Sequence, residues 1–85
     1  MAVDMKHAGA YKATCDPDLS LKAKGLFFYL YMRHGEHVTV ERIVEDCAEG
    51  VAAVRRAIKE LEDAGYLRRE RYYVNRGAAY HWILL

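Results

Sequence analysis

Basic side chains gather in the second half of this 85-residue sequence. Residues 51–64 contain Arg55, Arg56 and Lys59, and residues 65–85 contain four arginines against one glutamate. A guanidinium group can donate two parallel hydrogen bonds to the O6 and N7 atoms of guanine, and it also binds phosphates. This is the chemistry that recognition of double-stranded DNA requires. The groups can act together only if the chain places them on one surface.

The first basic segment has the periodicity of an amphipathic helix. Its apolar residues fall on one face: Val51, Val54, Ala57, Ile58, Leu61 and Ala64. The three basic residues fall on the opposite face together with Ala52. Small residues at positions 52 and 53 would let the backbone approach the bases and contact thymine methyl groups. We predict a recognition helix, ended by Gly65, whose DNA contacts are Ala52, Ala53, Arg55, Arg56 and Lys59.

Three acidic residues, Glu60, Glu62 and Asp63, crowd the C-terminal half of the same segment. The helix dipole disfavours negative charge there, and the sequence offers no stabilising reason for it. The acids leave the positive charge in the N-terminal half of the exposed face, which is the half that normally meets the bases.

Two further helices are expected before the recognition helix. Ser20 is a suitable N-cap for a helix that runs to about Arg33, and Thr39 can cap a shorter helix over residues 40–48. Residues 37–39 are β-prone and predict a short strand. Residues 1–16 show little periodicity, and we expect an arm with one extended piece at residues 11–14.

The helix after Ser20 has two apolar stripes instead of one. One is the expected core stripe, and the other consists of Leu21, Phe28 and Met32 with Gly25 among them. A helix that is apolar on two sides must bury both. The second stripe is therefore expected to pack on the arm, on the last strand or on another subunit, and we predict it as a homodimer interface.

The C-terminal segment is rich in aromatic and β-branched residues and predicts a hairpin with strands at 66–74 and 78–85. The loop 75–77 has the sequence Asn-Arg-Gly, in which glycine is available for a positive φ. We expect Arg76 at the tip to reach a minor groove or phosphates. Phosphate contacts are also expected from Arg69 and Arg71 of the hairpin, and from Lys22 and Lys24 of the first helix.

Three helices followed by a basic hairpin predict an α+β fold, the winged helix-turn-helix. The predicted organisation is an N-terminal arm at residues 1–16 and one domain at residues 17–85. The helix-turn-helix unit would consist of the helices 40–48 and 51–64, joined at Glu49 and Gly50.

Two segments also resemble known families. Residues 19–26, LSLKAKGL, resemble the first-helix signature of winged-helix domains in phage and plasmid replication-initiator-like proteins. Residues 54–67, VRRAIKELEDAGYL, resemble the end of the recognition helix and the start of the wing in those proteins, and are similar to GntR-type repressors. Together the resemblance covers residues 17–85 and implies that Arg55 contacts DNA. The sequence departs from both families at residues 49–52, Glu-Gly-Val-Ala, where they usually have Ser or Thr.

The sequence contains no pattern typical of catalysis, cofactor binding or metal binding. No catalytic triad, carboxylate pair or phosphate-binding glycine loop can be assembled, so we expect no enzyme and no cofactor or small-molecule ligand. His34 and His37 flank a glycine in a turn, and Cys15 and Cys47 lie far apart, so we expect no metal site. The first residues do not combine a basic stretch with an apolar run, so we expect no signal peptide, and no apolar run reaches about 18 residues. These features predict a cytoplasmic protein with free thiols.

The sequence therefore predicts sequence-specific binding of double-stranded DNA by a homodimeric transcriptional regulator, a repressor of phage, plasmid or bacterial type. One alternative is a replication or recombination accessory protein. A second is a winged helix that contacts another protein, because the net charge of +1 is low for a DNA-binding domain.

Overall fold

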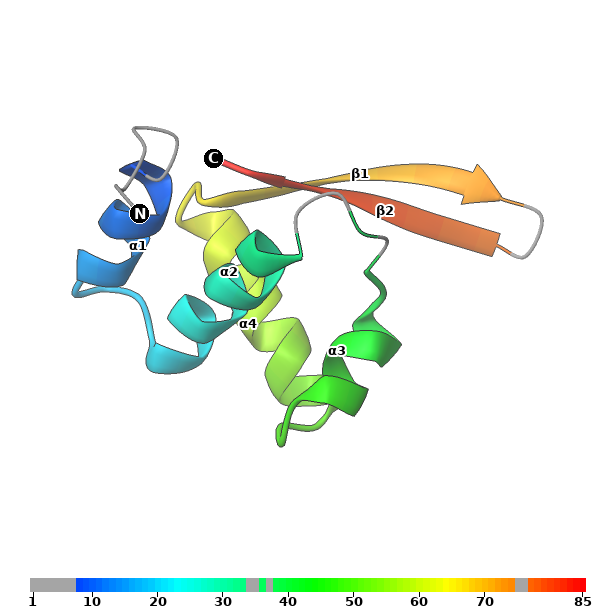
Figure 1. Ribbon diagram of the computed structural model, residues 1–85, viewed down its shortest axis with the longest axis horizontal. Helices are drawn as coiled ribbons and strands as arrows, with labels where there is room; N and C mark the ends of the chain where they lie inside the picture. Colours follow the sequence, from blue (N-terminus) through cyan, green and yellow to red (C-terminus); the bar gives the residue numbers. More distant parts are fainter. Residues whose placement is uncertain (1–7, 34–35, 37, 75–76) are drawn as a thin grey trace.

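The computed structural model describes residues 8–33, 36, 38–74 and 77–85, and at residues 8, 71–74 and 77–80 its description is limited to the backbone. Along this part of the chain, helices come first and a β-hairpin follows (Figure 1). The elements are α1 (Ala8–Cys15), α2 (Leu21–Met32), α3 (Val40–Asp46), α4 (Val51–Asp63), β1 (Leu67–Val74) and β2 (Gly77–Leu84).

The central helix α2 begins and ends close to where the sequence predicts. The Ser20 hydroxyl caps it by accepting a hydrogen bond from the Ala23 amide at 3.1 Å. The core stripe is buried and packs against α1, α4 and β2. The second stripe is not covered: Leu21, Phe28 and Met32 are all exposed. Neither α1 nor β2 buries this stripe, so two of the three expected packing partners are excluded for the described residues.

The next helix, α3, also starts at its predicted cap. The Thr39 hydroxyl accepts a hydrogen bond from the Arg42 amide at 3.1 Å, and α3 begins at the next residue. This helix is shorter than expected because Cys47 adopts an extended backbone, with φ −123° and ψ 161°. Residues 47–50 then form the turn that leads into α4, whose N-cap is Gly50.

The end of α4 is a C-terminal cap of the type that requires glycine. Gly65 has φ +83°, a conformation that costs a side-chain-bearing residue about 1–2 kcal/mol. Its amide donates to the carbonyl of Glu62 at 3.1 Å, and the amide of Tyr66 donates to that of Leu61 at 2.9 Å. These two bonds satisfy carbonyls that the helix end would otherwise leave free, and they direct the chain into β1.

The hairpin is antiparallel, with Leu67 opposite Leu84 at its base and Val74 opposite Gly77 at its far end. Gly77 therefore belongs to β2 instead of the predicted loop, while Asn75 and Arg76 lie outside the described residues. The predicted short strand is also wrong where it can be seen, because Val38 and Thr39 are not part of a strand. The Val38 carbonyl instead accepts a hydrogen bond from the Trp82 indole at 2.8 Å.

The expectation of an extended piece at residues 11–14 is wrong, because this segment lies within α1. Ala10 and Ala13 are buried in the same core as α2, and the Thr14 hydroxyl donates to the carbonyl of Ala10 at 2.8 Å. A face made of alanines buries little apolar area, so its periodicity is weak in the sequence. A Cβ at Gly9 would lie 2.5 Å from the Leu85 carbonyl oxygen, which shows how closely α1 approaches the end of the chain (Figure 1).

The loop between α1 and α2 is fixed to the root of the hairpin. The Tyr66 hydroxyl donates a hydrogen bond to the Asp16 carboxylate at 2.7 Å, and the Asp18 amide donates to the same carboxylate at 2.9 Å. The Tyr66 hydrogen bond is the main reason why the pKa of Asp16 lies below its usual 3.8. The same bond raises the pKa of Tyr66, so its hydroxyl stays protonated at neutral pH.

We expect the variant Tyr66→Phe to melt at a lower temperature than the unmodified protein at pH 7, and to lose most of this difference in acid. A carboxyl group whose pKa is lowered by folding stabilises the fold above its unfolded pKa, and this stabilisation disappears as the pH falls through the folded pKa. Thermal melts at pH 7 and at about pH 2, which lies well below the unfolded pKa of about 3.9, test this. An equal difference at both pH values would contradict it.

Candidate nucleic-acid interface

The outward face of α4 has the composition that the sequence predicts. Val54, Ala57, Ile58 and Leu61 are buried, whereas Ala52, Arg55, Arg56 and Lys59 are exposed. Among the residues that the structure describes, neither Arg55 nor Arg56 has an ion-pair or hydrogen-bond partner on its side chain. Both guanidinium groups are therefore available to an external partner.

A groove of about 820 Å³ runs beside this face, between α4, the start of α3 and strand β1. Arg55, Lys59 and Arg69 line it and so bring basic groups from α4 and β1 together. Three acids also line the groove, namely Glu41, Glu62 and Asp63. The potential of the groove thus depends on how these acids are paired.

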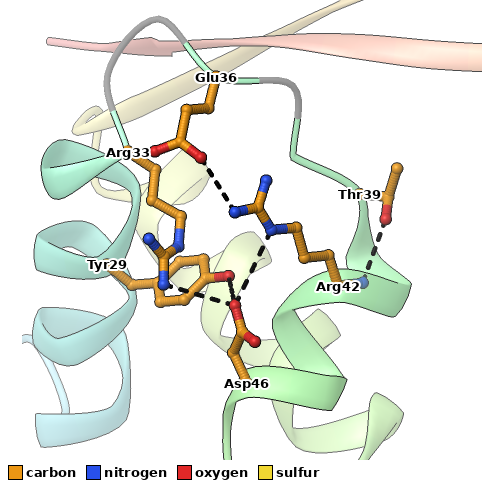
Figure 2. Close-up of polar contacts among 6 residues, drawn as sticks. All are labelled: Tyr29, Arg33, Glu36, Thr39, Arg42 and Asp46. Atoms are coloured by element: carbon orange, nitrogen blue, oxygen red, sulfur yellow. Dashed lines mark hydrogen bonds and ion pairs between the residues drawn. The ribbon is translucent and has the colours of Figure 1, made fainter.

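A polar network holds α3 against the end of α2 (Figure 2). At its centre, the Asp46 carboxylate accepts a hydrogen bond of 2.5 Å from the Tyr29 hydroxyl and lies 3.5 Å from the Arg33 guanidinium group. Arg33 also stacks over the Tyr29 ring at 4.4 Å from its centroid. Burial and the Asp46 bond raise the pKa of Tyr29, so this hydroxyl remains a donor at neutral pH.

Arg42 completes the network from α3 itself. Its guanidinium group lies 2.9 Å from Glu36 and 3.9 Å from Asp46 (Figure 2). The sequence places Arg42 and Asp46 four residues apart on the polar face of a helix, but it does not show their contacts with α2 and Glu36. In the structure they fix the orientation of α3, and thereby of the turn that leads into α4.

The arrangement of α3, a tight turn and an outward-facing α4 is the geometry of a helix-turn-helix. Residues 18–67 match the model of a family described as Helix-turn-helix domain. The chain belongs to this family. No curated protein and no solved structure shows a significant match to the chain.

The helix-turn-helix domain spans α2, α3 and α4, and the hairpin that follows it has the position of a wing. The predicted α+β winged helix-turn-helix fold is thereby confirmed. A helix-turn-helix domain is a DNA-binding domain, which confirms DNA as the class of partner. No helix among the described residues is long and apolar enough to cross a membrane.

The structure explains why acids crowd the end of α4 in this helix-turn-helix domain. The Glu60 carboxylate accepts hydrogen bonds from the Ser20 amide at 2.6 Å and from its hydroxyl at 2.9 Å. It thereby satisfies the amide of the N-cap of α2, as a glutamate at the third helical position does in a capping box. Glu60 thus connects the first helix of the domain to the recognition helix.

The other two acids pair with residues that the sequence predicts as DNA contacts. Glu62 forms a two-pronged ion pair with Arg69, through bonds of 3.2 Å and 3.1 Å. Asp63 binds Lys59 at 3.1 Å across one helical turn. The Glu62–Arg69 pair is half-buried and the Asp63–Lys59 pair is exposed. Arg69 is therefore engaged at the root of the wing, while Lys59 is tied only by a weak surface pair.

The root of the wing has a second anchor that the sequence does not reveal. Trp82 lies opposite Arg69 in the hairpin, and the Arg69 guanidinium group is 5.8 Å from the centroid of the indole ring. The indole in turn binds the Val38 carbonyl before α3. Arg69 thus connects the hairpin to α4, and Trp82 connects it to the segment just before α3. The sequence alone does not show that Arg69 lies opposite Trp82, because this depends on how the two strands are aligned.

The remaining predicted DNA contacts either lie apart from the outward face of α4 or are among the residues that the structure does not describe. Ala53 and Lys22 line a different groove, of about 340 Å³, between α2, α3 and α4. Lys24 lies beside Asp16 and contributes to lowering the pKa of that carboxyl, after the Tyr66 and Asp18 hydrogen bonds. The side chain of Arg71 is among those not described, and Arg76 lies outside the described residues. Arg55, Arg56 and Lys59 are therefore the predicted contacts that share one exposed face.

We expect Glu62→Gln to increase the affinity for duplex DNA and to make its salt dependence steeper. The substitution removes one negative charge from the groove and replaces the ion pair of Arg69 by a weaker contact, so the charge of Arg69 becomes more available to a phosphate. One additional phosphate contact changes the slope of log affinity against log salt by about one. Glu45→Gln is the matched control, because Glu45 is an exposed acid on α3 and has no ion pair within the described part of the chain. An equal effect of both variants would show that Arg69 does not reach DNA.

Proposed function

We propose that this chain binds specific sequences of double-stranded DNA by inserting α4 into the major groove. The observation that supports the proposal most directly is that the Arg55 and Arg56 side chains are exposed and unpaired within the described residues. Both are exposed on the outward face of the recognition helix and are unpaired within the described residues, whereas the acids of the same helix are occupied by other partners. A helix about 10–12 Å in diameter fits the major groove, which is about 12 Å wide.

The residues of α4 have different roles in this proposal. Arg55 and Arg56 read bases, because a guanidinium group can bind the edge of a guanine with two hydrogen bonds. Ala52 permits close approach of the backbone in the first turn. Lys59 exchanges Asp63 for a phosphate, since an exposed lysine–carboxylate pair is worth little.

The hairpin has a supporting role. Arg69 holds the wing in position and, like Arg71, contacts a phosphate, whereas Arg76 contacts phosphates or the minor groove. Lys22 and Lys24 contribute to the attraction of the duplex through their charge. None of these groups is expected to determine the sequence preference, because phosphate contacts position a protein without reading bases.

We further propose that the chain is a transcriptional regulator of phage, plasmid or bacterial type. It would act as a cytoplasmic repressor that occupies its operator, without a catalytic step. The resemblance of residues 54–67 to GntR-type repressors supports this reading, and the resemblance of residues 19–26 to replication-initiator-like proteins supports a role at a replication origin as the alternative.

Selection from a pool of random duplexes tests the proposal. We expect one sequence family to be enriched, and its affinity to fall with salt with a log–log slope of about −4 to −5 if about five phosphates are neutralised. Lys12→Ala on α1 is the control for a charge change away from the interface. If no sequence is enriched and the affinity is micromolar or weaker at every salt concentration, the domain contacts protein instead.

A further inference from the structure

The outer face of α2 carries an apolar stripe that nothing in the described part of the chain covers. It consists of Leu21, Gly25, Phe28 and Met32, spaced four, three and four residues apart along one side of the helix. Leu21 is 85% exposed, Met32 is 73% exposed and Phe28 is 44% exposed. A surface helix normally presents polar residues on this side. Such an exposed apolar stripe is typical of a protein contact.

We propose that a second copy of this chain packs on the stripe, with the two α2 helices antiparallel. The first argument is that the stripe is complementary to itself. Leu21 and Met32 lie equally far from its middle, and so do Gly25 and Phe28. A twofold axis through the middle therefore places Leu21 opposite Met32 of the other copy, and Phe28 opposite Gly25 of the other copy.

The shapes of the opposed residues fit this register. A Cβ placed on Gly25 would meet no heavy atom within 4 Å, so the surface over this glycine is open. Phe28 is the largest side chain of the stripe, and its ring packs edge-on against Tyr31 at 6.4 Å between centroids. In the antiparallel pair, each Phe28 ring fills the open surface over the Gly25 of the other copy. The glycine also lets the two helices approach closely.

The second argument is the placement of charge on α2. The helix has no acid in its first turn and no base in its last turn. Its lysines, Lys22 and Lys24, instead lie near its own N-terminus, where the helix dipole disfavours positive charge. Antiparallel packing brings them beside the last turn of the other helix, where the negative end of the helix dipole favours positive charge. The two lysines are unfavourably placed in a lone helix and favourably placed in an antiparallel pair, in which the charge of Arg33 at the C-cap is already paired with Asp46.

The contact does not depend on DNA binding. The stripe lies on the side of α2 opposite to its buried residues, and those residues pack toward α4 and α1. DNA bound to Arg55, Arg56 and Lys59 on the outward face of α4 would leave Phe28 and Met32 accessible. Leu21 and Gly25 also line the groove that Ala53 borders. A helix of 12 residues is about 18 Å long, so the paired surface is smaller than the ~800 Å² per partner of a standard interface. We therefore expect a weak dimer, populated at high micromolar concentration.

Sedimentation equilibrium between about 10 and 500 µM tests the proposal. The unmodified protein should pass from monomer to dimer over this range. Gly25→Leu should weaken the dimer by at least about tenfold, because the new side chain occupies the place of Phe28 from the other copy. The monomer should fold at least as well, since the site is open and leucine favours helix.

The swapped double variant, Gly25→Leu with Phe28→Ala, gives the decisive comparison. It exchanges the large and the small residue of the opposed pair, so it should recover dimerisation relative to either single variant. If the stripe instead binds an unrelated apolar partner, Gly25→Leu should strengthen that contact and the swap should restore nothing. Failure of the swap, or a monomer at every concentration, would overturn the proposal.

A pair of charge variants tests the second argument. Replacing Lys22 and Lys24 together by glutamate places acids at the N-terminus of α2, which should raise the melting temperature of the monomer. The same change should weaken the dimer, because the acids then lie beside the last turn of the other helix. Lys12→Glu on α1 is the control. A dimer constant unchanged by the double substitution would contradict the antiparallel orientation.

Discussion

Replacing Arg55 or Arg56 by alanine is expected to weaken binding of the selected duplex by about tenfold to a hundredfold, which corresponds to about 1–3 kcal/mol. A guanidinium group that binds a guanine with two hydrogen bonds also fixes the base at that position, so the preference for this base should relax. The structure supports this expectation because both side chains are exposed and are unpaired within the described residues. Their loss therefore removes no internal contact that would complicate the interpretation.

Fluorescence anisotropy with the selected duplex and with single-base variants provides the measurement. Lys12→Ala removes one positive charge from α1, away from the recognition helix, and should change the affinity little. The circular dichroism spectrum should be the same for all variants. If neither arginine variant loses affinity, α4 does not read bases and the proposed interface is wrong.

Local signals explain why the helix-turn-helix could be predicted from the sequence. Ser20 and Thr39 cap α2 and α3 through their own hydroxyl groups, and such bonds depend only on residues three positions apart. The amphipathic pattern of α4 and the glycine after it are equally local. The hairpin follows from its β-prone composition. Each of these features can be recognised without knowledge of the tertiary structure.

The parts that could not be predicted depend on contacts between distant residues. The negative charge of Glu60 is unfavourable near the C-terminus of its own helix. Its role as an acceptor for the Ser20 amide cannot be predicted, because Ser20 lies 40 residues away in the sequence. Arg69 is predicted as a phosphate contact, and only the structure shows that Trp82 lies opposite it and that Glu62 of α4 pairs with it. An isolated sequence shows the charge of such residues but not their partners.

The helix α1 shows a different limit of sequence reasoning. Its buried face consists of the alanines Ala10 and Ala13, which contribute little hydrophobic signal. The exposed Tyr11 between them is 74% accessible and gives the segment an apparent β character. Packing against α2, and not local propensity, determines its structure.

Replacing Phe27 by alanine is expected to lower the free energy of unfolding by about 3–5 kcal/mol, which is a large part of the stability of a small domain. Phe27 is only 2% exposed, and its ring packs edge-on against Tyr66 at 6.3 Å between centroids. The side chain thus connects α2 to the root of the hairpin. Its removal leaves a cavity in the centre of the core, which the surrounding helices can only partly close.

The neighbouring residue supplies a matched control of the same type in the same helix. Phe28 is 44% exposed on the opposite side of α2, so Phe28→Ala should change the free energy of unfolding by less than about 1 kcal/mol. Urea unfolding at low micromolar concentration, where the protein is monomeric, separates the two effects. Phe28→Ala should instead weaken self-association at high concentration. Equal losses of stability in the two variants would mean that the outer stripe of α2 is buried within the monomer, and the proposed dimer would lose its interface.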